Sequence, residues 1–312
     1  MLGGHPASVW IGFTALILIL LVLDLAVLNR KSHVLTPKEA ARWSGTLVTI
    51  AMAFCGFIWW REGSPKALEF LTGYLIELSL SVDNLFVFIL IFQYFDVPAA
   101  LQPKVLKWGI IGAIIMRAIM IGFGAILIQR FDWIIYVFGG ILIITGIRMY
   151  LAKGDDRMDL ERNPLIRFVR RVLPVVRSYR RDKFFGRTVT GAWYATPLFL
   201  VLIMVEWTDL VFAIDSIPAI FAITSDPFIV YSSNVFAILG LRALFFLLAG
   251  MLDKFIYLKP GVALILVFVG IKMVISGWVH LPTLLSLGVI VTVLTAAVLL
   301  SMRKSRLETS LP

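Results

Sequence analysis

Apolar residues fill long stretches of this chain, and short polar segments separate them. Each stretch has roughly the 20 residues that an α-helix needs to cross a hydrocarbon core about 30 Å thick. We therefore expect an all-α, polytopic membrane protein with about nine transmembrane helices. The predicted spans are 9–28, 44–60, 69–93, 106–128, 133–151, 195–222, 229–250, 260–276 and 283–301.

The composition supports this class, and the distribution of charge gives an orientation. Hydrophobic residues make up 60% of the 312 positions and charged residues only 15%, against about 25% charged in a soluble domain. The net charge is +10, and 11 of the 29 basic residues lie between Lys153 and Arg187. Basic residues beside spans mark the cytoplasmic side, so we expect the N-terminus outside and the C-terminus in the cytoplasm. This basic loop is also a candidate contact for anionic lipid, whereas no nucleic-acid site is expected.

The cysteine content argues against disulfides and thiolate metal sites, and the first apolar stretch does not have the features of a cleaved signal peptide. Cys55 is the only cysteine, so neither a disulfide framework nor a thiolate metal site can form within one chain. The first stretch follows no basic leader and precedes no small-residue cleavage site. We expect it to be a retained helix, not a signal peptide.

An internal repeat relates two groups of three spans. The segment from Glu77 to Asn84 aligns with the segment from Asp209 to Ser216, and both carry two acids six positions apart. Three spans per copy is an odd number, so the copies must be inverted in the membrane, as in many secondary transporters. An ancestral duplication without transport is the alternative. Further matched pairs are Arg117 with Arg242, Asp132 with Asp253, and Gly146 with Gly270.

The repeat divides the chain into five parts. They are an N-terminal two-helix segment (1–68), the first repeat (69–151), the basic cytoplasmic loop (152–194), the second repeat (195–276), and a final helix with a basic tail (277–312).

Five carboxylates lie inside the predicted spans that begin the two repeats. A charged group at the bilayer centre costs at least about 2.5–3.5 kcal/mol on insertion scales, so these acids indicate a path for cations, protons or both. Residues seven apart share a helix face, and Pro218 frees the carbonyl of Ile214 beside one of the acids. The candidate metal-binding residues are Glu77, Asp83, Asn84, Glu206, Asp209, Asp215 and Ser216.

The donor atoms of this set narrow the choice of ion. Carboxylate, amide and hydroxyl oxygens suit Mg²⁺, Ca²⁺ and Mn²⁺, whereas Zn²⁺ and Cu⁺ favour imidazole and thiolate. The histidines, His5, His33 and His280, lie at or outside span ends. Zinc and copper are therefore poor candidates, and oxygen chemistry alone does not rank the other three ions.

Two arginines inside the repeats, Arg117 and Arg242, are candidate counter-charges to the acids, or parts of interhelical salt bridges. Five acids and two arginines leave excess negative charge, so we expect some acids to be protonated when no metal is bound. Binding a dication would then release protons, which gives a route to proton-coupled export. Asp24, near the end of the first span, is expected to be interfacial rather than part of an ion path.

Three strings resemble the TerC family of bacterial membrane proteins, most closely its Alx-type members. They begin at Asp24, at Glu77 and at Glu206, and the resemblance extends from about residue 8 to 302. It implies manganese export across the bacterial inner membrane, with Mn²⁺ as the transported ion. An association with tellurite resistance and a proposed redox role also attach to the family. Its motif acids map onto Glu77, Asp83, Glu206, Asp209 and Asp215.

Enzymatic functions are not expected. The sequence contains no Gly-x-Gly-Asp, His-Glu-x-x-His or Gly-x-Ser-x-Gly string and no phosphate-binding loop, so hydrolysis of peptides, esters or ATP lacks its usual machinery. Transport would have to use an ion gradient or the membrane potential. A scaffold without transport activity stays open as the alternative function.

Overall fold

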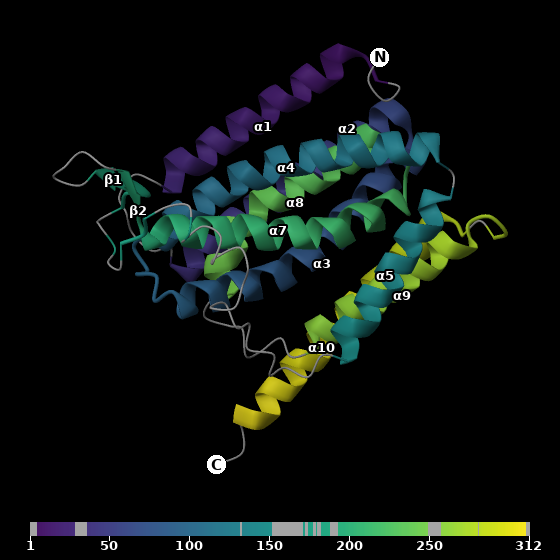
Figure 1. The fold of residues 1–312 in the computed structure, drawn as a ribbon. Helices are drawn as coiled ribbons and strands as arrows, with labels where there is room; N and C mark the ends of the chain where they lie inside the picture. The colour runs from purple at the N-terminus through teal and green to yellow at the C-terminus, as the bar shows by residue number, and fades with distance from the viewer. Residues whose placement is uncertain are drawn as a thin grey trace.

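A computed structural model describes the chain over residues 5–28, 36–131, 133–151, 193–248, 257–279 and 281–309, and over 171, 174–176, 179 and 182–187 in the connecting loop. Within these ranges, nine helices are long and apolar enough to cross a membrane (Figure 1). The predicted number of spans and the all-α class are confirmed. The side chains of 25–28, 37, 83, 86, 129, 248 and 305–309 lie outside this description.

Most helices extend beyond the apolar stretches that predicted them. The helices are α1 (Ala7–Leu28), α2 (Pro37–Glu62), α3 (Ser64–Tyr94), α4 (Gln102–Arg130), α5 (Ile134–Leu151), α7 (Pro197–Phe221), α8 (Pro227–Leu248), α9 (Leu258–Ile275) and α10 (Thr283–Thr309). α2 begins seven residues before the predicted 44. There Thr36 and Glu39 form a capping box and a proline occupies the first turn, and both favour helix initiation.

Four helices form the centre of the bundle. α3 packs against both α7 and α8, and α4 packs against the same two helices. α1 and α2 cover one side of this core, while α5, α9 and α10 lie on the other (Figure 1). The first and second helices of each predicted repeat therefore meet at the centre, where the carboxylates lie.

The crossing of α5 and α9 is built on glycines and is reciprocal. A Cβ added to Gly146 would lie 2.8 Å from the backbone oxygen of Ala263, and one added to Gly270 would lie 2.8 Å from that of Gly139. Gly146 and Gly270 differ by 124 positions, as do Gly139 and Ala263. The later residue of α5, Gly146, meets the earlier residue of α9, Ala263, so the two helices are antiparallel, as inverted copies require. This symmetry supports the repeat inferred from the sequence.

Adjacent glycines of α5 give a matched test of this crossing. A Cβ on Gly139 would lie 2.9 Å from the backbone oxygen of Gly270, whereas a Cβ on Gly140 would meet nothing within 4 Å. We expect Gly139→Ala to lower stability by about 1–3 kcal/mol through overpacking. Gly140→Ala should be neutral or stabilising, because alanine favours helix more than glycine does. Thermal unfolding in detergent would measure both variants, and equal effects would contradict this packing.

The described part of the connecting loop docks on the end of the bundle where α3 stops and α4 starts. The hydroxyl of Tyr179 donates to the carbonyl oxygen of Phe95 at 2.6 Å. Lys104 pairs with the carboxylate of Asp182 at 3.2 Å, and this hydrogen bond lowers the pKa of Asp182. A short antiparallel hairpin, β1 (Phe185–Arg187) and β2 (Trp193–Ala195), completes this end. The sequence analysis did not predict this hairpin.

Several sequence predictions fall outside the described residues. They concern most of the 152–194 loop, with its expected lipid contact, and also His33, Asp132, Asp253 and His280.

Candidate functional site

Arg117 of α4 joins carboxylates from both predicted repeats in the interior of the bundle. Its guanidinium contacts Glu77 of α3, and its Nη2 lies 3.2 Å from Oδ1 of Asp209 on α7. Nη1 also donates to the hydroxyl of Ser216 at 3.1 Å. Arg117 and Glu77 are fully buried and Asp209 is 2% exposed. We call Glu77, Arg117, Asp209 and Ser216 the central cluster; its formal charge is −1 when both acids are ionised.

A fourth helix contributes an amide to the central cluster. The Nδ2 group of Asn234 on α8 donates to the second carboxylate oxygen of Glu77 at 3.0 Å. Its Oδ1 atom is buried and has no hydrogen-bond partner among the described residues, and the same holds for Ser81 Oγ and Asn84 Nδ2 on α3. Nearly all buried polar atoms in proteins are hydrogen-bonded. Of these three atoms, Asn234 Oδ1 and Ser81 Oγ can accept a hydrogen bond or ligate a cation, whereas Asn84 Nδ2 is only a donor.

The other two described acids of α7 face different neighbours. The carboxylate of Glu206 packs directly on Gly112 of α4, where any Cβ would overlap it. Asp215 accepts a hydrogen bond from Thr145 of α5 at 2.9 Å, so it faces α5 rather than Arg117. Neither acid contacts a basic side chain within the part of the chain that the structure describes.

Arg242, which aligns with Arg117 in the second repeat, pairs with a different acid. Its Nη2 lies 3.0 Å from Oδ2 of Asp24 on α1 and donates to the Asp24 backbone oxygen at 2.6 Å. The indole of Trp43 on α2 donates to the same carboxylate at 2.5 Å. Asp24 and Arg242 are each 2% exposed. Asp24 is thus buried between α1, α2 and α8 and paired with Arg242, and its expected interfacial depth stays a prediction.

This buried pair gives a stability prediction. Arg242→Met would leave the Asp24 carboxylate buried without its cation, and we expect a loss of about 3–5 kcal/mol. Adding Asp24→Asn should recover part of that loss, because the remaining amide is neutral. Arg303→Met removes an arginine from the exposed surface of α10 and serves as the control. Unfolding by denaturant in detergent would measure all four proteins; wild-type stability in Arg242→Met would refute the pairing.

Two cavities bear on access to the central cluster. A hollow of about 460 Å³ at the loop-bearing end is lined by Gln93, Asp96 and Gln102 together with apolar side chains. A void of about 10 Å³ touches Asp209 and is lined by Phe88. Phe92 lines the polar hollow and Phe88 lines the void beside Asp209; the two rings are buried and one turn apart on α3.

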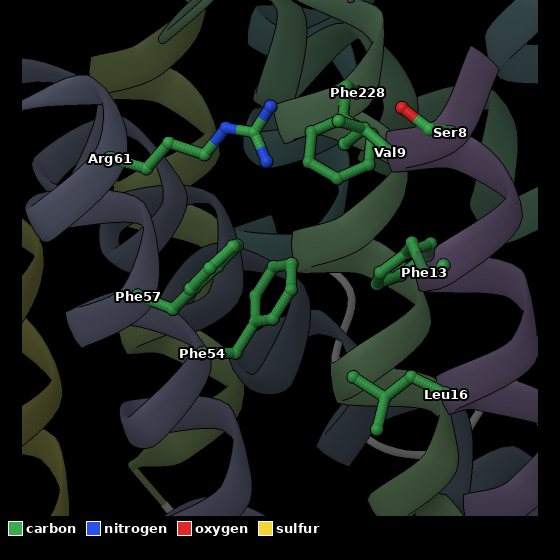
Figure 2. A pocket seen from close by; sticks show the side chains of 9 residues that line it. Ser8, Val9, Phe13, Leu16, Phe54, Phe57, Arg61 and Phe228 are labelled. Atoms are coloured by element: carbon green, nitrogen blue, oxygen red, sulfur yellow. The ribbon is translucent and has the colours of Figure 1, made fainter. Parts of the chain in front are cut away.

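A groove between α1 and α2 is of a different kind. It has a volume of about 480 Å³, and aromatic and aliphatic side chains line it, with Arg61 reaching across one end (Figure 2). Its lining includes none of the candidate acids. This groove therefore offers no carboxylate ligand to an ion.

Comparison with known proteins now identifies the family. The model of the integral membrane protein TerC family matches residues 62–308. This chain belongs to the TerC family. It is 51% identical over 294 residues, 91% of each chain, to an Escherichia coli K12 protein whose provisional name is membrane-bound redox modulator Alx.

Other TerC-like relatives have less informative names. A Myxococcus xanthus protein, named as an uncharacterized membrane protein, is 49% identical over 97% of this chain and 94% of its own length. A Rickettsia bellii protein with a similar name is 44% identical over 94% and 96% of the two chains. No solved structure matches the chain.

For this TerC-family chain, the structure brings together part of the predicted set. Glu77, Asp209 and Ser216 meet at Arg117, while Glu206 and Asp215 lie elsewhere on α7. Asn84 is buried, and the side chain of Asp83 is outside the description. α7 continues past Pro218 to Phe221. The sequence analysis did not name Asn234 or Thr145 as site residues. Each is a polar residue within an otherwise apolar span, and that feature could have identified them.

Proposed function

We propose that this TerC-family protein is a secondary transporter that exports divalent metal cations, Mn²⁺ in particular, from the cytoplasm. The supporting observation is the central cluster, in which two acids from two repeats share one arginine in a buried setting. Isolated charges are costly in a bilayer and mark functional paths. An arginine between two carboxylates holds the position that a dication would take.

On binding, the metal ion would take the place of the Arg117 guanidinium between Glu77 and Asp209. When a metal ion enters, Glu77 and Asp209 would become its ligands, and the hydroxyl of Ser216 and the free Oδ1 of Asn234 would complete an oxygen set. Hard divalent ions favour such ligands. The guanidinium would turn away and return after release, so the cluster would never be left with two unpaired acids.

The route from the cytoplasm would begin in the hollow near Asp96. Its polar lining can hold a hydrated ion. Phe92 lines this hollow, and Phe88, one turn away on α3, lines the void that touches Asp209. We propose that these two rings move aside when the ion passes. In the opposite state the central cluster would open toward the other end, as alternating access between repeats requires.

Proton coupling is the proposed source of energy. Glu206 and Asp215 add two acids to α7 without basic contacts in the described chain. An unpaired ionised carboxylate away from water is costly, so protons would neutralise part of this charge in the metal-free protein. Arrival of a dication would release them, and a proton gradient directed inward would then drive export.

Redox chemistry is not proposed, although it appears in the provisional name of the Escherichia coli relative. Cys55 is the only cysteine of the chain, and its thiol donates to the backbone oxygen of Ala67 at 3.5 Å. A dithiol couple cannot form within one chain. A scaffold that assists a separate transporter is the alternative that must be tested.

Manganese content of cells would separate transporter from scaffold. In a strain that lacks its own manganese exporters and is loaded with Mn²⁺, the wild-type protein should lower intracellular manganese and Glu77→Gln should not. Glu39→Gln is the matched control, because glutamine also serves at this capping position of α2. Equal manganese content with wild type and Glu77→Gln would favour the scaffold.

A further inference from the structure

A histidine and two carboxylates meet at the end of the bundle opposite the described loop segment. His5 precedes α1, Glu62 ends α2, and Asp226 precedes α8. The Nδ1 atom of His5 lies 3.5 Å from Oε1 of Glu62, and its Nε2 atom lies 3.0 Å from Oδ2 of Asp226. The three side chains are 13%, 20% and 11% exposed in that order. Three distant segments of the chain therefore converge on one imidazole.

The spacing of these groups suits a metal ion. One ligand atom from each residue lies within 4.8 Å of the others. Metal–ligand bonds of about 2.0–2.2 Å place the ligands of a tetrahedral ion roughly 3.3–3.6 Å apart, so the three side chains would have to move closer together. The imidazole, whose two nitrogens now face different carboxylates, would also turn so that one nitrogen binds the ion. We propose that His5, Glu62 and Asp226 form a second site, for a divalent transition-metal ion.

The surrounding charge also fits a dication. Lys66 lies 2.9 Å from Glu69 and 3.3 Å from Asp226. With a neutral imidazole, the side chains of Glu62, Asp226, Glu69 and Lys66 together carry a formal charge of −2. Arg61 and Lys272 are further basic side chains near this end. Lys66 keeps Glu69 as a partner if Asp226 turns toward a metal ion. The bound ion would neutralise the group without forcing a cation out of it.

The ligand chemistry differs from that of the central cluster. Imidazole nitrogen favours transition metals over Mg²⁺ and Ca²⁺, which favour oxygen sets. The hydroxyl of Thr224 donates to Glu69 at 2.6 Å, and Glu69 lies on α3 eight residues before Glu77, roughly 12 Å along the helix. The second site would thus select for transition metals at the end of the bundle where an exported ion would leave. Binding there does not require that the central cluster transports.

Nitrogen coupling in the electron spin echo spectrum of bound Mn²⁺ would test the site. The experiment uses the purified full chain with a tag that contains no histidine. Wild type should show imidazole nitrogen coupling that excess Mg²⁺ does not remove. His5→Ala should lose the coupling and bind at least about 10- to 100-fold more weakly at this site. His33→Ala and His280→Ala should retain both.

Two outcomes would overturn the proposal: no nitrogen coupling in wild type, or unchanged coupling and affinity in His5→Ala. Glu62→Gln should weaken binding in a second, independent variant, and thermal unfolding would show that each protein is folded. Asp209→Asn should retain the nitrogen coupling even if it abolishes transport. Failure of this site and failure of the proposed transport function are therefore distinguishable.

Discussion

Asp209→Asn is expected to lower Mn²⁺ transport by at least about 100-fold. The substitution removes one of the two proposed acidic ligands at the central cluster, and even an outer partner of a metal ligand is worth about 10- to 100-fold in affinity. The variant should fold, because Arg117 keeps its contact with Glu77. Initial rates of Mn²⁺ flux into inverted membrane vesicles would measure the loss.

The control for this prediction is Asp182→Asn. It makes the same chemical change at a side chain that is 68% exposed and paired only with Lys104 among the described residues. Its transport rate should equal that of wild type. A rate for Asp209→Asn within twofold of the control would remove Asp209 from the ion path.

Arg117→Met is expected to cause a large loss of stability. Both Glu77 and Asp209 would stay buried with no cation beside them, and breaking a buried ion pair in this way costs about 3–5 kcal/mol. Asn234 would still donate to Glu77, but an amide does not offset a full charge. Yield of folded protein and unfolding by denaturant in detergent would measure the loss.

A triple variant separates stability from transport. Arg117→Met combined with Glu77→Gln and Asp209→Asn leaves no charge in the central cluster, so most of the lost stability should return. Transport should stay absent, because both proposed acidic ligands are gone. If Arg117→Met alone were as stable as wild type, the central ion pairs would not exist in the folded protein.

The fold was accessible from sequence because the bilayer imposes a simple rule. Apolar stretches of about 20 residues identified all nine described spans, and seven-residue spacing placed Asp209 and Ser216 on one face, where both now contact Arg117. Helix ends were predicted less accurately. A polar first turn, such as Thr36 to Glu39, begins a helix several residues before its apolar stretch starts.

Partners across helices could not be read from one sequence. Arg117 and Arg242 occupy matched positions, yet one pairs with repeat acids and the other with Asp24 outside the repeats. That difference depends on where α1 packs, which periodicity does not encode. The same limit hid Asn234 as a neighbour of Glu77. His5 lay outside every span in the sequence, and only folding brings Glu62 and Asp226 to it.

Flux of Mn²⁺ into proteoliposomes is the most direct test of the central claim. Purified protein would be reconstituted with a metal-sensitive dye inside, and Mn²⁺, Mg²⁺ and Ca²⁺ would each be added with and without a pH gradient. The account predicts Mn²⁺ entry that a proton gradient accelerates and that Asp209→Asn abolishes. Wild-type protein that moves none of the three ions under any gradient would contradict it.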